Sequence, residues 1–196
     1  MGNAEHVTSP QHRPASGRLA LTLRQVIARW PSVLGLVALL GNLADGADPH
    51  VTAMIIIIAA TCYLGAAVLG SPRSAWAMVV VTGAAVLLAG LTGLDPTATL
   101  IALGIGLAVI GLIRSRGSHR REIGVQAVAF LVYSAIGLTA MMSDPTWTIY
   151  LAAAVALGHT AWDVAHFIRD KVVTRSLTEA CFVLDLGLAA ALLASA

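Results

Sequence analysis

Charged side chains are scarce in this chain of 196 residues. Asp, Glu, Lys and Arg make up 11% of it, against about 25% in a typical soluble domain. Hydrophobic residues reach 58%, and the mean hydropathy is +0.83. This composition excludes a soluble globular domain, so lipid must be the solvent for most of the chain.

Several chemical signatures are also missing. The chain has no glycine-rich phosphate loop and no Gly-x-Ser-x-Gly elbow, so any transport would be driven by a gradient. The last hydrophobic stretch lacks a lysine, which excludes a retinal Schiff base there. The two cysteines, Cys62 and Cys181, lie inside hydrophobic stretches and form no disulfide framework. We predict no cofactor.

The hydrophobic residues fall into seven stretches. About 17 to 25 apolar residues make one helical crossing of a bilayer, and the connections between the stretches are short. We therefore predict an all-α fold, a polytopic bundle of about seven transmembrane helices. The expected spans are Val26–Ala44, Val51–Leu69, Ala75–Leu91, Thr97–Ile113, Gly124–Met142, Trp147–Ile168 and Leu177–Ala194.

The first span is the weakest, because Pro31 interrupts it. Pro31 could end a short surface helix, Leu19–Arg29, and leave a brief span from Ser32 to Ala44. We expect a retained helix and not a cleaved signal peptide, since Asn42, Asp45 and Asp48 match a cleavage site poorly. Residues 1–17 are expected to be a disordered cytoplasmic tail, and residues 18–196 one domain.

The basic residues lie on one side of this ladder of spans. All twelve precede the first span or sit at its start, or lie in alternate loops: Arg13, Arg18, Arg24, Arg29, Arg73, Arg114, Arg116, Arg120, Arg121, Arg169, Lys171 and Arg175. The other loops hold Asp45, Asp48, His50, Asp95 and Asp144. This pattern predicts a cytoplasmic N-terminus and an outer C-terminus in the cell membrane. It favours membrane lipids as partners, excludes a nucleic-acid partner, and leaves a homo-oligomer open.

Ionisable groups inside the membrane are costly, so they point to function. His159, Asp163, His166 and Asp170 follow at spacings of four, three and four, which places them in one stripe on the sixth span. Asp185 should lie at the depth of Asp163 on the neighbouring helix.

The last span presents further polar groups. Thr178, Cys181 and Asp185 share a helix face, and would offer a hydroxyl, a thiol and a carboxyl to one cavity. Glu179 has a different interpretation, because Ser176 and Glu179 read as a capping box at the start of this helix.

Two alternatives compete for the polar stripe, and a separate acidic turn has its own interpretation. A buried His–Asp pair can hold helices together through hydrogen bonds of about 0.6 to 2 kcal/mol. The same side chains could ligate a metal, but the spacing lacks a His-x-x-x-His pair, and we predict no metal. The turn formed by Asp45, Asp48 and His50 is expected to be a solvated loop.

The preferred interpretation is a membrane enzyme with a lipid-soluble substrate. Asp163 or Asp185, kept protonated among apolar helices, would act as a general acid, and a neighbouring histidine (His159 or His166) or the second carboxylate would remove a proton at the end. The residues expected to bind an isoprenoid chain are Trp162, Tyr133 and Tyr63, whose rings stabilise passing cations, with Cys181 and Thr178.

Seven short-looped spans and the paired acids Asp163 and Asp185 give the chain an outline that resembles the small integral-membrane terpene cyclases of meroterpenoid and indole-sesquiterpene pathways. This resemblance implies protonation of an epoxide or alkene and cyclisation of a prenyl chain. Fungal members also use a glutamate in an early span, where this chain offers Asn42, Asp45 and Asp48.

A proton-linked transporter is the competing hypothesis. The His–Asp stripe resembles half of a proton path, which four residues of the fifth span could continue: Gln126, Tyr133, Ser134 and Thr139. A third hypothesis is an accessory subunit whose stripe contacts another membrane protein.

Overall fold

A computed structural model describes residues 29–196, which form seven α-helices and no strands. These are α2 (Trp30–Asn42), α3 (Pro49–Leu69), α4 (Ser74–Thr92), α5 (Pro96–Arg114), α6 (Gly117–Met142), α7 (Pro145–Arg169) and α8 (Arg175–Ser195). Six of them, α3 to α8, are long and apolar enough to cross a membrane. The predicted all-α, multi-pass fold is confirmed.

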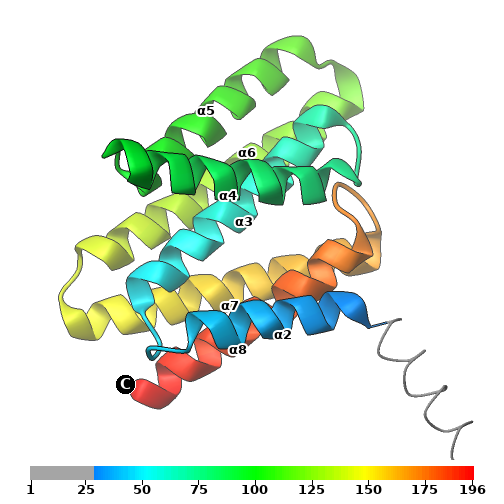
Figure 1. The fold of residues 1–196 in the computed structure, drawn as a ribbon. Coiled ribbons are helices and arrows are strands. Elements are labelled where there is room, and N and C mark those ends of the chain that lie inside the picture. Colours follow the sequence, from blue (N-terminus) through cyan, green and yellow to red (C-terminus); the bar gives the residue numbers. More distant parts are fainter. Residues whose placement is uncertain (1–28) are drawn as a thin grey trace, which may run out of the picture.

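Helix α3 is the centre of the bundle. It packs against α4, α5, α6, α7 and α8, and most of its residues are buried. In Figure 1, α4 and α5 lie on one side of α3, and α2, α7 and α8 lie on the other. Helices α4 and α5 leave much of their apolar surface exposed, as expected for helices that face lipid.

The basic connections gather at one end of the bundle. The start of α2 and the α3–α4, α5–α6 and α7–α8 connections lie together on the right of Figure 1, and the C-terminus lies at the opposite end. The predicted segregation of charge along the chain is therefore a segregation in space, with a basic end and an acidic end. Which end faces the cytoplasm stays a prediction.

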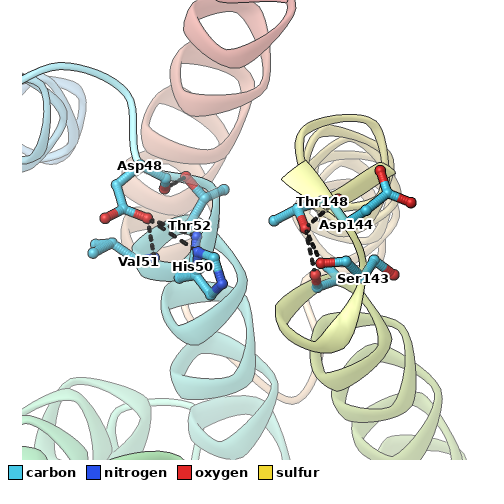
Figure 2. A network of polar contacts seen from close by, with 8 residues as sticks. Asp48, His50, Val51, Thr52, Ser143, Asp144 and Thr148 are labelled. Atoms are coloured by element: carbon cyan, nitrogen blue, oxygen red, sulfur yellow. Dashed lines mark hydrogen bonds and ion pairs between the residues drawn. The ribbon is translucent and has the colours of Figure 1, made fainter. Parts of the chain in front are cut away.

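The acidic end is built from helix caps. Asp48, Asp95 and Asp144 each stand directly before a proline and cap the helix that follows. Figure 2 shows two of these starts side by side: Asp48 Oδ1 accepts from the His50 backbone N–H at 2.7 Å, while the Thr148 hydroxyl donates to the carbonyls around Asp144. An Asp cap followed by Pro starts a helix well, so these acids have a structural role.

The first described helix is shorter than predicted. The span was expected to reach Ala44, but α2 ends at Asn42 and has 13 residues, which makes it about 20 Å long and too short for the hydrocarbon core. Pro31 occupies its first turn, because proline is tolerated where backbone N–H groups have no helical partner. Residues 26–28, most of the alternative helix Leu19–Arg29 and the predicted tail at 1–17 lie outside the described residues.

Helix α6 is longer than predicted. It begins at Gly117, whereas the expected span began at Gly124. The additional turns carry Arg120 and Arg121, which are exposed. Hydropathy marks the part of a helix that lies in lipid, so it misses polar turns that continue beyond the bilayer.

Small residues permit close helix contacts at several positions. A Cβ atom on Gly104 would lie 2.2 Å from the Phe130 ring, and one on Gly65 would lie 2.6 Å from Met78. A Cβ atom on Gly106 would meet nothing within 4 Å, so this glycine is not a packing position.

The contact between α2 and α8 depends on Gly35. A Cβ atom there would lie 2.3 Å from the Ala180 backbone oxygen. We expect Gly35→Ala to destabilise the protein by about 1–3 kcal/mol, because the backbone must move to relieve the overlap. Gly41→Ala is the matched control in α2, since a Cβ atom there meets nothing within 4 Å. Unfolding in detergent would measure both, and equal stabilities would contradict this role of Gly35.

Candidate functional site

Four helices bury polar side chains at one place in the bundle. We call this group the buried cluster: Tyr63 from α3, Gln126 and Tyr133 from α6, His159, Asp163 and His166 from α7, and Asp185 from α8. The side chains of His159, Asp163 and Asp185 are at most 1% exposed. Buried ionisable groups among apolar helices are the best candidates for function in a membrane protein.

His159 joins the two acids. Its Nδ1 lies 2.8 Å from Asp185 Oδ2 and 3.6 Å from Asp163 Oδ2. Asp163 and His159 are four residues apart and share a helix face, while Asp185 reaches them from α8. The expectation that Asp163 and Asp185 come together is therefore confirmed. One imidazolium balances one carboxylate, so the second carboxyl needs a proton or another cation to avoid an uncompensated buried charge.

Tyr63 holds one oxygen of Asp163. Its hydroxyl donates to Asp163 Oδ1, and its ring lies edge-on to His159 and His166, with centroids 5.3 and 5.0 Å away. Both side chains are buried. Asp163 is therefore held at Oδ1, and Oδ2 is left for other chemistry.

His166 is anchored at both ring nitrogens. Nδ1 lies 2.9 Å from the Trp162 carbonyl oxygen, and Nε2 lies 2.9 Å from Gln126 Nε2. A carbonyl oxygen only accepts, so Nδ1 carries the hydrogen, and Nε2 then accepts from the Gln126 amide. This arrangement gives His166 a neutral ring in which both nitrogens are already used.

Three atoms of the acid–histidine group have no hydrogen-bond partner among the described residues: Asp163 Oδ2, Asp185 Oδ1 and His159 Nε2. Most buried polar atoms in proteins are paired, and those that are not need an explanation. A bound substrate group or ion would supply the missing partners.

A first cavity, of about 330 Å³, lies between α2, α7 and α8. Asp163 lies at its inner wall, although none of that side chain is exposed to water. A substrate therefore reaches the carboxyl only after small movements of the surrounding side chains. The remaining lining residues are Arg29, Ser32, Val164, Phe167, Thr178, Glu179, Phe182 and Val183.

The predicted capping role of Glu179, which lines this cavity, is wrong. The residue does not form a capping box, because α8 begins at Arg175 and Thr174 is its cap. Glu179 instead accepts a hydrogen bond from Ser32 and lies 3.5 Å from Arg29 Nη1. Phe182 and Val183 lie three and four residues after Glu179, so the three side chains share one face of α8. A carboxylate on an otherwise apolar helix face is the sequence signal that indicates its position in a cavity.

A second cavity, of about 160 Å³, lies between α2, α3, α4 and α8 and is lined mostly by aliphatic side chains. Asp185 and Cys181 border it. Thr178 lines the first cavity, and its hydroxyl donates to the Arg175 carbonyl. The hydroxyl, thiol and carboxyl of α8 therefore do not share one cavity, because the two cavities lie on different faces of the helix.

The three aromatic residues expected to contact substrate line neither of these two cavities. Tyr63 is committed to Asp163. Tyr133 donates to the Gly158 carbonyl at 3.0 Å and lies edge-on to His159. Trp162 packs on His166 at 4.8 Å. Tyr63 and Tyr133 are part of the buried cluster and Trp162 packs against it, while the first cavity is lined by two other aromatic rings, Phe167 and Phe182.

Two of the four residues proposed for a longer proton path, Ser134 and Thr139, do not continue it. Ser134 is buried and has no hydrogen-bond partner among the described residues, and Thr139 is exposed and donates to its own helix. Toward the acidic end, the neighbours of the cluster on α7 and α8 are apolar: Ala152, Val155, Ala156, Leu188, Ala189 and Leu192. On α7 and α8, the cluster therefore has no polar neighbour immediately toward the acidic end among these buried side chains.

A metal ion is also chemically compatible with the group. One ligand atom each from His159, Asp163 and Asp185 lies within 4.8 Å of the others. Imidazole and carboxylate ligands suit several divalent transition metals, and Tyr63 would orient the ligating carboxylate from the second layer. The sequence-based expectation of no metal stays a prediction.

Tyr63→Phe tests the positioning of Asp163. We expect kcat to fall about tenfold with KM nearly unchanged, because a small shift of a catalytic group costs rate more than binding. Steady-state kinetics of whichever reaction the cluster performs would measure this. Tyr150→Phe is the control, since Tyr150 is exposed on α7. A rise in KM alone would place Tyr63 in substrate binding.

The structure therefore brings Asp163, Asp185 and His159 into direct contact, and links His166 to them through the Tyr63 ring. It also places Glu179 in the wall of the first cavity and Gln126 in the wall of a cavity at the basic end. No protein-family model matches the chain, and neither a curated protein nor a solved structure was found to be similar to it.

Proposed function

We propose that this protein is an integral-membrane enzyme of the cell membrane that protonates and cyclises a lipid-soluble isoprenoid. The observation that carries the proposal is Asp163, a buried carboxyl with one unpartnered oxygen at the wall of a largely apolar cavity. Mostly apolar cavities with a few placed polar groups are the usual form of small-molecule sites.

The charge balance supports Asp163 as the proton donor. Asp185 makes the shorter contact with His159, at 2.8 Å. We propose that His159 is an imidazolium, whose charge this contact pairs with the Asp185 carboxylate. Asp163 is then the carboxyl without a counter-charge, and its neutral, protonated form is the least costly in lipid. Because Oδ1 accepts from Tyr63, the proton belongs on Oδ2, which has no other partner.

In the proposed reaction Asp163 transfers its proton to an epoxide oxygen or an alkene carbon. The resulting cation is attacked by another double bond of the same chain, which closes a ring. Phe167 and Phe182 stabilise the cation with their ring faces. The final cation loses a proton to the Asp163 carboxylate, because the His159 imidazolium is already protonated. The product is therefore an isomer of the substrate, and the acid is restored.

Proton-coupled transport is the second candidate. The observation that favours it is the connection from the buried cluster through His166 and Gln126 to a cavity at the basic end. A transporter also needs a route to the other side, and the neighbours of the cluster toward the acidic end are apolar. The enzyme is therefore the better supported proposal.

Expression in a host supplied with prenylated precursors and grown in D2O tests the proposal. A cyclic product that gains deuterium only in membranes with the intact chain would support it. Identical extracts from the intact chain and an Asp163→Asn variant, across several precursors, would refute the cyclase. Proton flux in liposomes would then test the transporter.

A further inference from the structure

A third cavity, of about 560 Å³, opens at the basic end between α6, α7 and the turn that follows α7. Its lining is about half polar, unlike that of the two cavities beside the acids. The lining residues are Ser118, Arg121, Glu122, Val125, Gln126, His166, Arg169, Lys171 and Val172. None of these residues has a role in the proposed reaction.

The rim of this cavity is positively charged. Arg121, Arg169 and Lys171 contribute three positive charges against the one negative charge of Glu122. No described acidic side chain lies within ion-pair distance of these three, whereas Arg29 and Arg175 each have a carboxylate partner. Guanidinium and ammonium groups around a cavity are suited to a phosphate group.

The inner end of the cavity needs a hydrogen-bond donor. Gln126 is 2% exposed, and its amide nitrogen is used by His166, so its Oε1 is buried without a partner among the described residues. A phosphate oxygen cannot satisfy this acceptor, but a hydroxyl group beside the phosphate can. The cavity therefore pairs cations at its rim with a hydroxyl acceptor at depth.

The position of the cavity favours a lipid over a free anion. It lies beside the arginine-rich start of α6 and the end of α7, and basic side chains at the ends of membrane helices are expected at the level of the headgroups. Val125 lines the cavity and is also exposed, and Val128 continues this exposed apolar face one turn deeper. Acyl chains can lie along this face while the headgroup occupies the cavity.

We propose that the third cavity binds the headgroup of an anionic phospholipid that carries a free hydroxyl, such as phosphatidylglycerol. Basic pockets between transmembrane helices are known to bind such headgroups. The inference goes beyond the proposed enzyme function, which makes no use of this cavity.

Native mass spectrometry of the full chain, with phosphatidylglycerol added, tests this proposal. We expect one tightly bound lipid for each protein molecule. The double variant Arg169→Gln/Lys171→Gln should bind this lipid about 25-fold more weakly, because each lost positive charge lowers the affinity roughly fivefold. The matched control is Arg114→Gln/Arg116→Gln, which removes two basic residues at the same end that do not line the cavity. If the control variant loses as much affinity for the lipid, the proposal is wrong, and the lipid is attracted by the overall positive charge of this end of the protein.

Three further arms identify the headgroup chemistry. Phosphatidylcholine should bind at least tenfold more weakly, and equal binding would refute the anionic site. Inorganic phosphate at millimolar concentration should leave the lipid bound, and its displacement would instead indicate a site for free phosphate. Gln126→Met should lower the ratio of phosphatidylglycerol to phosphatidic acid affinity, and an unchanged ratio would refute the hydroxyl contact. Gel filtration and circular dichroism would establish that each variant is folded.

Discussion

Asp163→Asn is expected to lower the rate of the proposed cyclisation roughly 100- to 10,000-fold, the usual range for loss of a general acid. Asparagine has nearly the same shape and still offers an oxygen to the Tyr63 hydroxyl. The asparagine amide, however, cannot donate a proton to the substrate as a carboxylic acid does. The measurement is the yield of deuterium-labelled cyclic product for each amount of folded protein.

Asp170→Asn is the matched control for this substitution. Asp170 belongs to the same sequence stripe, but it is exposed at the end of α7 and lies 3.4 Å from Arg175. Its backbone has a positive φ of 50°, which asparagine tolerates well. We expect activity within a factor of two. A folded Asp163→Asn protein with full activity would exclude Asp163 as the donor, and a misassembled one would favour a role in holding helices together.

The second large effect concerns the pair between α7 and α8. We expect His159→Leu to destabilise the protein by about 3–5 kcal/mol, because it leaves a buried carboxyl without its partner. Asp185→Leu should cost a similar amount. The double variant should cost clearly less than the sum, because leucines at both positions leave neither group unpaired.

The magnitude of this coupling distinguishes two roles. Ordinary hydrogen bonds between membrane helices couple by about 0.6 kcal/mol on average, whereas a buried charge pair couples by about 1.5 kcal/mol or more. Unfolding of the four proteins in detergent gives the coupling directly. A Thr160→Ala variant controls for the general sensitivity of α7, since the Thr160 hydroxyl donates only to its own helix. A coupling near zero would contradict the ion pair.

Hydropathy predicted the membrane-spanning helices well. The ends of α3, α4, α5, α7 and α8 lie within about two residues of the expected spans, as is usual for helix boundaries. The larger error, at the start of α6, has a local cause. Helix α6 continues beyond its apolar part through arginine-rich turns that a hydrophobic pattern does not register. The end of α2 differs by two residues, and the predicted start of that span lies outside the described residues.

The candidate site was only partly predictable. The stripe on α7 follows from residue spacing along a single helix, and the depth of Asp185 follows from counting along two helices. Glu179 was assigned to a cap because its local sequence fits one, while the cap is in fact Thr174. The aromatic residues were assigned to substrate because they are aromatic, while in the structure they belong to the buried cluster or pack against it.

The sequence by itself therefore determined the class of protein, the positions of the six long spans and the separation of basic from acidic ends. These properties depend on the summed hydropathy and charge of residues that are neighbours in the sequence, and the free energy of transfer into lipid depends on the same sums. The tertiary structure alone decided which polar atoms meet. Tyr63 reaches Asp163 across 100 positions, and Ser32 reaches Glu179 across 147. Such contacts depend on the rotation of each helix and on which helices are neighbours, and many distant packing contacts set both at once.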